Sequence, residues 1–282
     1  MEKSKLTLAH LSLSAPPAET IAAAAGAGFS AVGLRICARR PGESYPGAIV
    51  GDARATRDLR RQIDDAGIRL SNVSAYQFFP EVRWEDLLPV VDTVVLLETP
   101  IVVVNSYDTD DTRFTDTFAR YCAELAPHGI RIALEFLPYS CVRNLVQAMR
   151  IIELSGASNA GVLLDALHLD RSGATAADVA RLAPERVIFA QLCDARKLTA
   201  PLSDEALQQE ARTGRLPAGE GELRLFDFLD ALPIGTEIEY EVTRADMLQS
   251  SALDKARAAR IDADRFMSRF LAARPAWRNR LV

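Results

Sequence analysis

Short apolar runs rich in β-branched residues alternate with longer amphipathic segments along nearly the whole chain. Runs of this kind are typical of buried strands, whereas amphipathic segments that end at glycine or proline are typical of helices. The pattern predicts eight strands, at 6–13, 30–36, 69–76, 101–107, 131–137, 160–169, 186–194 and 236–242. It predicts helices at 17–28, 52–67, 111–129, 143–156, 174–184 and 251–272.

The strands and helices alternate without a composition break or a linker, and this arrangement decides the predicted fold. Eight strand–helix units in 282 residues favour an α/β fold of one (β/α)8 type, a TIM barrel that forms a single domain over 1–282. An open doubly wound sheet is the alternative. It is weakened because LSLSAPPAET, at the end of the first strand, contains no glycine and therefore lacks the GxGxxG turn of a dinucleotide site.

Two long segments interrupt the alternation. One covers 37–52, after the second predicted strand, and the other covers 195–227, between the seventh and the eighth. Both leave the C-terminal ends of their strands, where barrel enzymes build their sites. We therefore expect both segments to contribute to a functional site.

Charge and composition exclude several classes of function. The net charge of −5 is spread along the chain without a basic run, which argues against nucleic acid or an anionic membrane as a partner. The chain has neither an apolar run long enough to span a membrane nor the apolar segment of a signal peptide. The four cysteines lack CxxC spacing, so we expect a cytoplasmic protein with buried, unpaired cysteines.

Each of four late strands carries a polar residue near its C-terminal end. These residues are Glu135 in ALEFL, Asp165 in LLDAL, Gln191 in FAQLC, and Glu239 or Glu241 in EIEYEV. Neighbouring strands lie about 5 Å apart, so these side chains are expected to converge at one rim of the barrel. Three carboxylates so close together repel, and a divalent cation removes the repulsion, since carboxylate and amide oxygens suit Mg²⁺ or Mn²⁺. The alternative is that each carboxylate pairs with an arginine or a backbone donor.

Periodicity leaves the ligand from the last strand open. It places Glu237, Glu239 and Glu241 on one face, with Glu237 nearest the N-terminal end and therefore the weakest candidate. His168 lies three residues after the aspartate, near the end of the predicted strand, where it can turn toward the pocket. His10 is a further candidate for the barrel interior.

At these positions the sequence resembles the xylose isomerase-like TIM-barrel superfamily, the group of sugar phosphate isomerases and epimerases. The likeness covers nearly the full chain in the order of its elements and in its strand motifs. Members hold one divalent metal with a Glu, an Asp, usually a His, and a final Glu from consecutive late strands. The resemblance implies that Glu135 in ALEF and Asp165 in LLDALH are metal ligands and that His168 acts at the substrate. It favours Glu241 in YEV over Glu239 as the last ligand.

The seventh strand departs from this pattern. Many members have H-x-x-D there, whereas this chain has QLCD, with Gln191 in the place of the histidine and Asp194 retained. A similar glutamine occurs in the 3-dehydroshikimate dehydratases, in which a basic loop with an R-x-x-R pattern precedes a P-G-E-like turn. EARTGRLPAGEGEL offers Arg212 and Arg215 before such a turn. The endonuclease IV branch is excluded, because it holds three zinc ions with many histidines and this chain has three histidines in all.

The predicted chemistry is proton abstraction next to a carbonyl. A metal held by three carboxylates and an amide stabilises the enediolate that forms when this proton leaves. The expected cofactor is one divalent ion, Mn²⁺ or Mg²⁺, with Co²⁺ and Zn²⁺ as alternatives. Glu135 and Glu241 are the candidates for proton transfer, and His168 is the candidate for orienting a substrate oxygen or protonating a leaving hydroxyl.

The expected partner is a small-molecule substrate, and a homo-oligomer is compatible with the sequence. Arg212 and Arg215 are candidates to hold a carboxylate or phosphate of the substrate by bidentate bonds. Asn105, Tyr107 and Tyr76 are expected to form the walls of the pocket. The leading hypothesis is a metal-dependent isomerase or epimerase of a small polyhydroxy ketone or sugar. The alternatives are a dehydratase acting on a cyclic hydroxyketo acid and a non-catalytic barrel that binds a ligand.

Overall fold

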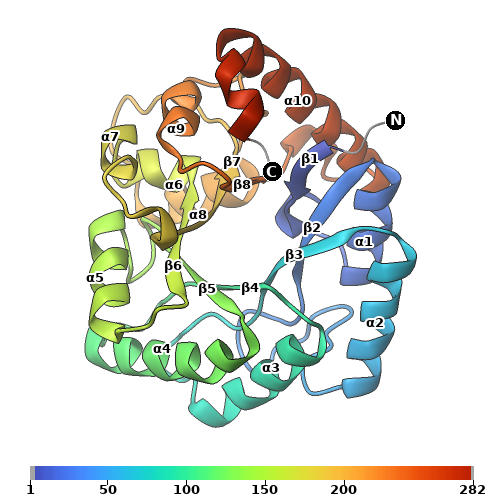
Figure 1. Ribbon diagram of the computed structural model, residues 1–282, viewed down its shortest axis with the longest axis vertical. Coiled ribbons are helices and arrows are strands. Elements are labelled where there is room, and N and C mark those ends of the chain that lie inside the picture. The colour runs from blue at the N-terminus through green and yellow to red at the C-terminus, as the bar shows by residue number, and fades with distance from the viewer. Residues whose placement is uncertain (1–3, 281–282) are drawn as a thin grey trace.

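The computed structural model describes residues 4–280, and its eight parallel strands close into a barrel in sequence order. Each strand pairs with the next along the chain, and the last pairs with the first. Figure 1 shows the strands around a common centre with helices outside them. The strands are β1 (Ser4–Leu8), β2 (Phe29–Arg35), β3 (Arg69–Ser74), β4 (Ile101–Val104), β5 (Arg131–Glu135), β6 (Ala160–Asp165), β7 (Val187–Leu192) and β8 (Glu237–Tyr240). The predicted TIM barrel is therefore confirmed.

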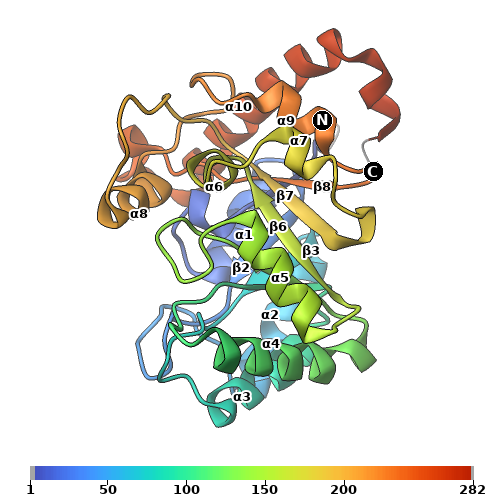
Figure 2. The same ribbon diagram turned by 90° about the vertical axis from the view of Figure 1, so that its left-hand side faces the viewer.

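Helices surround the barrel and connect its strands. They are α1 (Pro17–Gly26), α2 (Ala53–Asp65), α3 (Trp84–Leu96), α4 (Asp111–Leu125), α5 (Leu145–Ser155), α6 (Ala166–Arg171), α7 (Ala176–Val179), α8 (Asp204–Thr213), α9 (Leu225–Ala231) and α10 (Ala252–Ala273). Short 3-10 helices are η1 (His10–Ser12), η2 (Ala126–His128), η3 (Pro184–Arg186), η4 (Ala245–Met247) and η5 (Pro275–Arg280). In Figure 2, α8 lies on the left-hand side of the molecule.

Several predicted boundaries are wrong, and the largest error affects the site. The strand predicted at 160–169 ends at Asp165, because α6 begins directly after it. The strands predicted at 6–13 and 101–107 also end early, at Leu8 and Val104. Past Asp165 the apolar run continues as ALHL, and such a run suits a buried helix as well as a strand.

The helix prediction was incomplete. It missed α3, which contains Pro89, and it treated α8 and α9 as parts of one long loop. The helix predicted at 174–184 is reduced to the short α7, which ends at Val179, and Pro184 begins a separate 3-10 turn. The long segment at 37–52 is irregular, as predicted.

Two layers of apolar side chains hold the fold together. The larger layer lies between the strands and the helices and includes residues from α1 to α10. A separate small group fills the barrel interior beneath the polar rim. Its members are Ile101, Val103, Ala133, Leu163, Ile188 and Phe189. The interior is therefore a packed core and not a channel, as in other barrels of this type.

An irregularity between β2 and β3 directs an amide into the barrel. Val32 pairs with Leu70, but Gly33 pairs with Asn72, so Ser71 is an extra residue in β3. A bulge of this kind changes the direction of the side chain that follows it. A Cβ atom at Gly33 would overlap with the Glu239 carboxylate and lie 2.8 Å from Asn72 Oδ1. Glycine at position 33 therefore leaves room for the hydrogen bond from Asn72 to Glu239 across the barrel.

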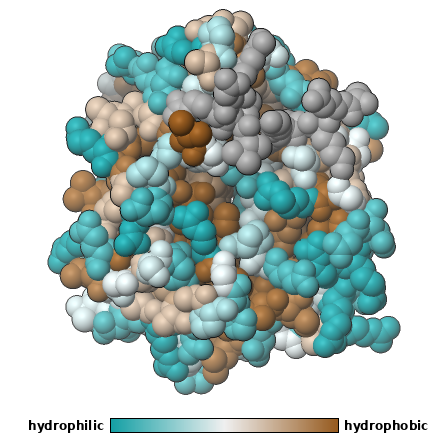
Figure 3. All heavy atoms as spheres, viewed as in Figure 1, coloured by the Kyte–Doolittle hydropathy of each residue, from teal (hydrophilic) through white to brown (hydrophobic). Residues whose placement is uncertain are grey.

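The described part of the chain includes no helix that is long and apolar enough to cross a membrane. Figure 3 shows one face of the molecule, on which polar residues are mixed with small groups of apolar ones. The four cysteines are unpaired, and all except Cys141 are buried. The prediction of unpaired cysteines is confirmed, and the prediction of burial holds for the other three.

Candidate active site

A polar cavity opens at the C-terminal ends of the strands. Its lining includes four of the residues singled out from strands β5 to β8, namely Glu135, Gln191, Glu239 and Glu241. Asp165 at the end of β6 pairs in register with Gln191, which pairs in turn with Glu239. The structure thus brings these predicted site residues to one rim of the barrel.

The two oxygens of the buried Asp165 carboxylate serve different purposes. Oδ1 accepts hydrogen bonds from the backbone N–H groups of Leu167, at 2.7 Å, and His168, at 3.0 Å, and so caps α6. Oδ2 lies 2.6 Å from a guanidinium nitrogen of Arg215. Burial alone would raise the pKa of Asp165, but the charge of Arg215 and these hydrogen bonds hold that pKa below its ordinary value.

Arg215 is enclosed within the carboxylate cluster and not exposed on a surface loop. Its side chain is 1% exposed and contacts both Asp165 and Glu241, with Nη2 at 2.8 Å from Glu241 Oε2. Its Nε donates to the carbonyl of Ala211 at 2.8 Å. Asp165 and Glu241 thus both pair with an arginine, which is the kind of partner that the sequence analysis considered in place of a metal.

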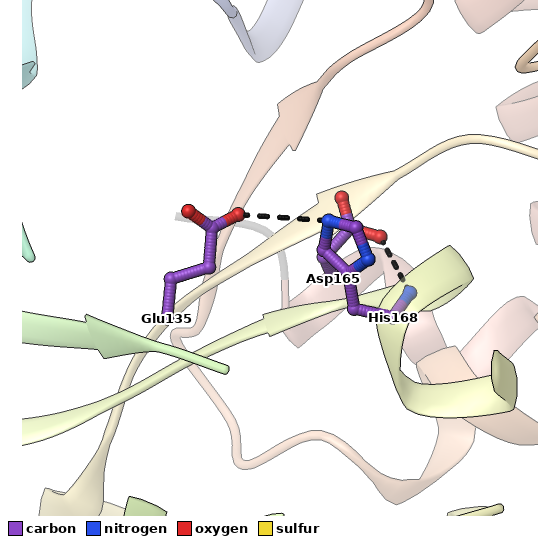
Figure 4. Close-up of side chains that lie close together, drawn as sticks. All are labelled: Glu135, Asp165 and His168. Carbon is purple, nitrogen blue, oxygen red and sulfur yellow. Dashed lines mark hydrogen bonds and ion pairs between the residues drawn. The ribbon is translucent and has the colours of Figure 1, made fainter. Parts of the chain in front are cut away.

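Within the described residues, Glu135 forms no ion pair with an arginine or lysine, although the charge of Arg215 lowers its pKa slightly. Asn105 donates to its Oε2 at 3.1 Å, and Nε2 of His168 lies 4.0 Å from its Oε1. Figure 4 shows Glu135 and His168 pointing toward one another, with Asp165 beside the imidazole ring. Burial and the nearby carboxylates of Glu241 and Asp165 raise the pKa of Glu135 to about 8.

His168 comes from α6 and not from a strand. The turn into the helix, which the Asp165 cap begins, directs the imidazole back over the cavity. Burial lowers the pKa of His168 to about 4, although the charge of Asp165 opposes this shift. The imidazole is therefore neutral at pH 7.

Glu239 and Glu241 lie in different surroundings. Glu239 accepts from Asn72 at 2.8 Å and from Gln191 Nε2 at 2.7 Å, so each of its oxygens is bound by an amide. Burial and the charge of Glu241 raise its pKa to about 8. Glu241 accepts from Gln191 Nε2 at 3.1 Å and pairs with Arg215, and burial still raises its pKa to about 7.

The donor set fits a divalent cation. Glu135, Asp165 and His168 each offer a ligand atom, and these atoms lie within 4.8 Å of one another. Gln191 Oε1 is buried and has no hydrogen-bond partner among the residues that the structure describes. An amide oxygen that lacks a hydrogen-bond donor, close to the carboxylates of Glu135 and Glu241, is suited to a hard cation. Such a cation would share Asp165 and Glu241 with the Arg215 guanidinium or displace it.

The predicted wall residues are only partly brought together. Asn105, Tyr107 and Arg212 line the cavity, as does His10 from η1. Tyr76 is not among the residues that line it and packs against the hydrophobic core. Its neighbour Gln77 lines the cavity instead.

Several residues that line the cavity were missed by the sequence analysis. They are Arg35, Arg39, Asn72, Ser74, Gln77 and Tyr139. A signal existed for Arg35, because it alternates with Gly33 in the strand SAVGLRI and so shares its inward face. The inward direction of Asn72 depends on a bulge that no local pattern announces.

Asp194 explains how the long segment after β7 is held. Its carboxylate accepts from the backbone N–H groups of Ala195, Gly219 and Leu223, at 2.9, 2.9 and 3.0 Å. Its own backbone bridges Leu216 in both directions. A Cβ atom at Gly221 would overlap with this carboxylate, so glycine is required there. Asp194 thereby fixes the segment that carries Arg215.

The sequence profile of the xylose isomerase-like TIM barrel family matches residues 21–263, and the chain therefore belongs to this family. An inosose isomerase from Halalkalibacterium halodurans is 25% identical over 184 residues, which cover 60% of this chain and 62% of that protein. A 3-dehydroshikimate dehydratase from Pseudomonas aeruginosa is 23% identical over 273 residues, which cover 89% of this chain and 40% of that protein. The matches thus span less than two thirds of the length of either relative.

The solved structure of the IOLI protein with a bound zinc atom has a TM-score of 0.77 at 18% identity, covering 95% of this chain and 99% of that chain. At this identity the likeness establishes the fold alone. The curated relatives are an isomerase and a dehydratase, both named for small molecules. Membership of this family therefore supports an enzyme, and the reaction has to be argued from the site.

Proposed function

We propose that the protein is a divalent-metal-dependent isomerase or epimerase that removes a proton from the carbon next to the carbonyl of a small polyhydroxy ketone or sugar. The observation that carries this proposal is a pair of carboxylates on one cavity. Glu135 and Glu241 are both largely buried, and in the metal-free protein burial raises their pKa values to about 8 and about 7. A bound cation would lower both pKa values, so that the carboxylates could accept a proton from the substrate and return it.

The ligands would be Glu135, Asp165, Gln191 and Glu241, with Glu239 as the alternative to Glu241. A cation bound there supplies Lewis-acid polarisation of a carbonyl oxygen. Of the two glutamates, Glu241 is the better candidate, because both oxygens of Glu239 already accept hydrogen bonds from amides. Asn72 and Gln191 thereby hold Glu239 in place beneath the rim.

The chain's own residues divide the remaining tasks. Glu135 accepts the proton from the substrate, and Asn105 orients its carboxylate through the bond to Oε2. Glu241 holds the second exchangeable proton, so return of a proton from the other side gives epimerisation. His168 is neutral at pH 7, so it orients a substrate hydroxyl by hydrogen bonding better than it protonates one.

Dehydration is the second candidate reaction, and the amide at position 191 favours it. Gln191 stands where many family members have a histidine, and one relative is a 3-dehydroshikimate dehydratase. In that reaction, loss of the proton next to the carbonyl is followed by loss of hydroxide from the next carbon. A carbon–carbon double bond forms, and the proton and hydroxide leave as water. The same base, Glu135, serves both reactions.

Proton NMR in D₂O separates the two reactions. The protein with Mn²⁺ is incubated with an inosose and, separately, with 3-dehydroshikimate. Deuterium at the carbon next to the carbonyl without a new double bond supports the isomerase. Growth of ultraviolet absorbance from a conjugated product supports the dehydratase. Absence of both changes with either compound would count against the proposal.

Glu135→Gln tests the base directly. We expect exchange to fall by about a thousandfold or more, since a positioned base alone contributes about 10²–10⁴-fold. Glu153→Gln, on the exposed side of α5, is the matched control and should leave exchange unchanged. If Glu135→Gln exchanged at the rate of the control, Glu135 would not be the base.

A further inference from the structure

Three arginines line the same cavity above the carboxylates. Arg35 ends β2, Arg39 follows it in the irregular segment, and Arg212 lies in the last turn of α8. The three come from two segments that are far apart in the sequence. Each is half-buried and not exposed.

None of the three has a carboxylate partner within the part of the chain that the structure describes. The Nη1 atom of Arg35 donates to the carbonyl of Ala75 at 3.0 Å, which satisfies one of its N–H groups. The next residue along the chain differs, because the exposed Arg40 lies 3.5 Å from Glu81 and stacks on the ring of Phe79. Arg39 and Arg40 are therefore neighbours in sequence with opposite surroundings.

The three guanidinium groups repel one another. Partial burial and the charge of Arg212 lower the pKa of Arg39, while burial and the charge of Arg39 lower that of Arg35. Among the neighbours whose charge raises the pKa of Arg39, the exposed Glu43 has the smallest effect. Like charges held together with partial burial are costly unless an anion binds between them.

The charges of Glu135 and Glu241 compensate part of the charge of Arg35, but no carboxylate of the described rim acts in this way on Arg39. Asp165 and Glu241 are already paired with Arg215, and Glu239 is bound by two amides. A divalent cation at the rim would neutralise the remaining negative charge. The upper part of the cavity then carries an excess of positive charge that faces the substrate.

We infer that Arg35, Arg39 and Arg212 form a subsite for a carboxylate or phosphate group of the substrate, so that the substrate is an anionic hydroxyketone and not a neutral sugar. This inference rests on the proposed function, because it assigns the substrate class of the same cavity. Guanidinium groups bind both anions through charge-assisted hydrogen bonds, so the two sources share one chemistry.

A pair of matched ligands tests the subsite. Catechol and 3,4-dihydroxybenzoate offer the same diol and differ by one carboxylate. Calorimetry is done with the Mn²⁺-loaded and the metal-free protein. Affinity for the benzoate should be at least about tenfold higher than for catechol, because the carboxylate forms charge-assisted hydrogen bonds that catechol lacks. Equal affinities would overturn the inference.

Single substitutions locate the effect. Arg39→Gln and Arg212→Gln should each reduce affinity for the benzoate by about tenfold and leave that for catechol unchanged. Arg40→Gln is the matched control, because its side chain pairs with Glu81 on the surface. A loss in Arg40→Gln equal to that in Arg39→Gln would overturn the assignment, because it would indicate general attraction to positive charge.

Competition distinguishes the two sources of the anion. Inorganic phosphate and acetate are added at constant ionic strength, and displacement of the benzoate is measured. Stronger displacement by phosphate supports a phosphate ester as substrate, and equal or stronger displacement by acetate supports a carboxylic acid. Displacement by neither ion contradicts the subsite.

The failure of this inference can be told apart from failure of the proposed function. Glu135→Gln should abolish hydrogen exchange yet keep the preference for the benzoate. If the wild-type protein shows this preference but no exchange with any substrate, the proposed function fails and the subsite stands. If it exchanges hydrogen on neutral inosose and has no preference for the benzoate, the subsite fails and the proposed function stands.

Discussion

At the scale of single residues, Arg215 determines the charge balance of the site. Its guanidinium contacts two carboxylates that belong to two different strand ends, Asp165 after β6 and Glu241 after β8. All three side chains are buried. A buried ion pair contributes little net stability when it is intact, but removal of one partner leaves a charge that water cannot solvate.

Arg215→Met is therefore expected to lower the free energy of unfolding of the metal-free protein by about 3–5 kcal/mol. Because Mn²⁺ can replace the lost positive charge, the same ion should stabilise the variant more than it stabilises the wild type. Urea unfolding with and without Mn²⁺ measures both effects. Arg212→Gln is the control, since Arg212 has no carboxylate partner among the described residues, and it should change stability by less than about 1 kcal/mol. An equal Mn²⁺ effect in Arg215→Met and wild type would contradict this account.

The buried glutamates make the stability of the metal-free protein depend on pH. Burial and neighbouring charge raise the pKa values of Glu135 and Glu239 from the ordinary 4.5 to about 8. For a group whose pKa is raised by folding, the stabilising contribution is complete below the unfolded pKa and is lost as pH rises through the folded pKa. Stability should therefore fall between about pH 4.5 and pH 8.

Glu239→Gln tests this assignment, because it removes one titrating group. The amide retains an oxygen that can accept from Asn72 or Gln191. The variant should lose less stability than the wild type between those two pH values, as measured by thermal unfolding in chelator. The exposed substitution Glu153→Gln should reproduce the wild-type slope. A variant slope as steep as that of the wild type would exclude Glu239 as a source of the pH dependence.

At the scale of elements, the turn from β6 into α6 shows what the sequence could and could not predict. The carboxylate at Asp165 was predicted as a site residue because it interrupts an apolar run. The same run reads equally well as strand or buried helix, so the start of α6 was missed and His168 was assigned to a strand. The N-cap role of Asp165 links these two facts, since one carboxylate both begins the helix and pairs with Arg215 of the site.

The segment between β7 and β8 depends on Asp194 in the same way. Three backbone N–H groups converge on one carboxylate, one from Ala195 at the start of the segment and two from Gly219 and Leu223 near its end. Asp194→Ala would leave buried donors without partners, at about 1–3 kcal/mol each for those that water cannot reach. We expect loss of amide hydrogen-exchange protection at Gly219 and Leu223, with a lower free energy of unfolding.

Because this segment carries Arg212 and Arg215, Asp194→Ala should also weaken substrate binding more than it slows the chemical step. Hydrogen exchange monitored by mass spectrometry measures the first effect, and the ratio of the changes in KM and kcat measures the second. Asp204→Ala, which lies on the same segment but pairs with Arg143 at the surface, is the control. Unchanged protection at Gly219 in Asp194→Ala would mean that other contacts hold the segment.

At the scale of the whole molecule, the barrel was predictable because the pattern of a strand followed by a connecting segment is repeated eight times. Errors at single boundaries do not alter a count of strands or the side of the barrel to which their C-terminal ends point. Burial of Arg215 and the inward direction of Asn72 were not predictable, because they depend on a long segment folding back and on a bulge between two strands. Local patterns carry no information on either.

The proposed metal site would be a property of the whole molecule, because its proposed ligands come from the ends of four strands. A cation that binds the closed barrel and not the unfolded chain stabilises it by about 2.7 kcal/mol at a concentration 100 times its dissociation constant. We expect Mn²⁺ to raise the free energy of unfolding of the wild type by about this amount. EDTA should reverse the gain, as measured by urea unfolding.

Asp165→Asn tests the metal site most directly. Its amide oxygen can still accept from the N–H groups of Leu167 and His168, so the cap of α6 is retained. The variant loses the ion pair with Arg215, so its stability without metal will fall. The quantity to compare is therefore the stability gained on adding Mn²⁺. We expect that gain to be largely lost in Asp165→Asn and kept in Asp170→Asn, an exposed substitution on the same helix. If Asp165→Asn gained as much stability from Mn²⁺ as the wild type, the cation would bind elsewhere, and the carboxylates would then be balanced by Arg215 alone.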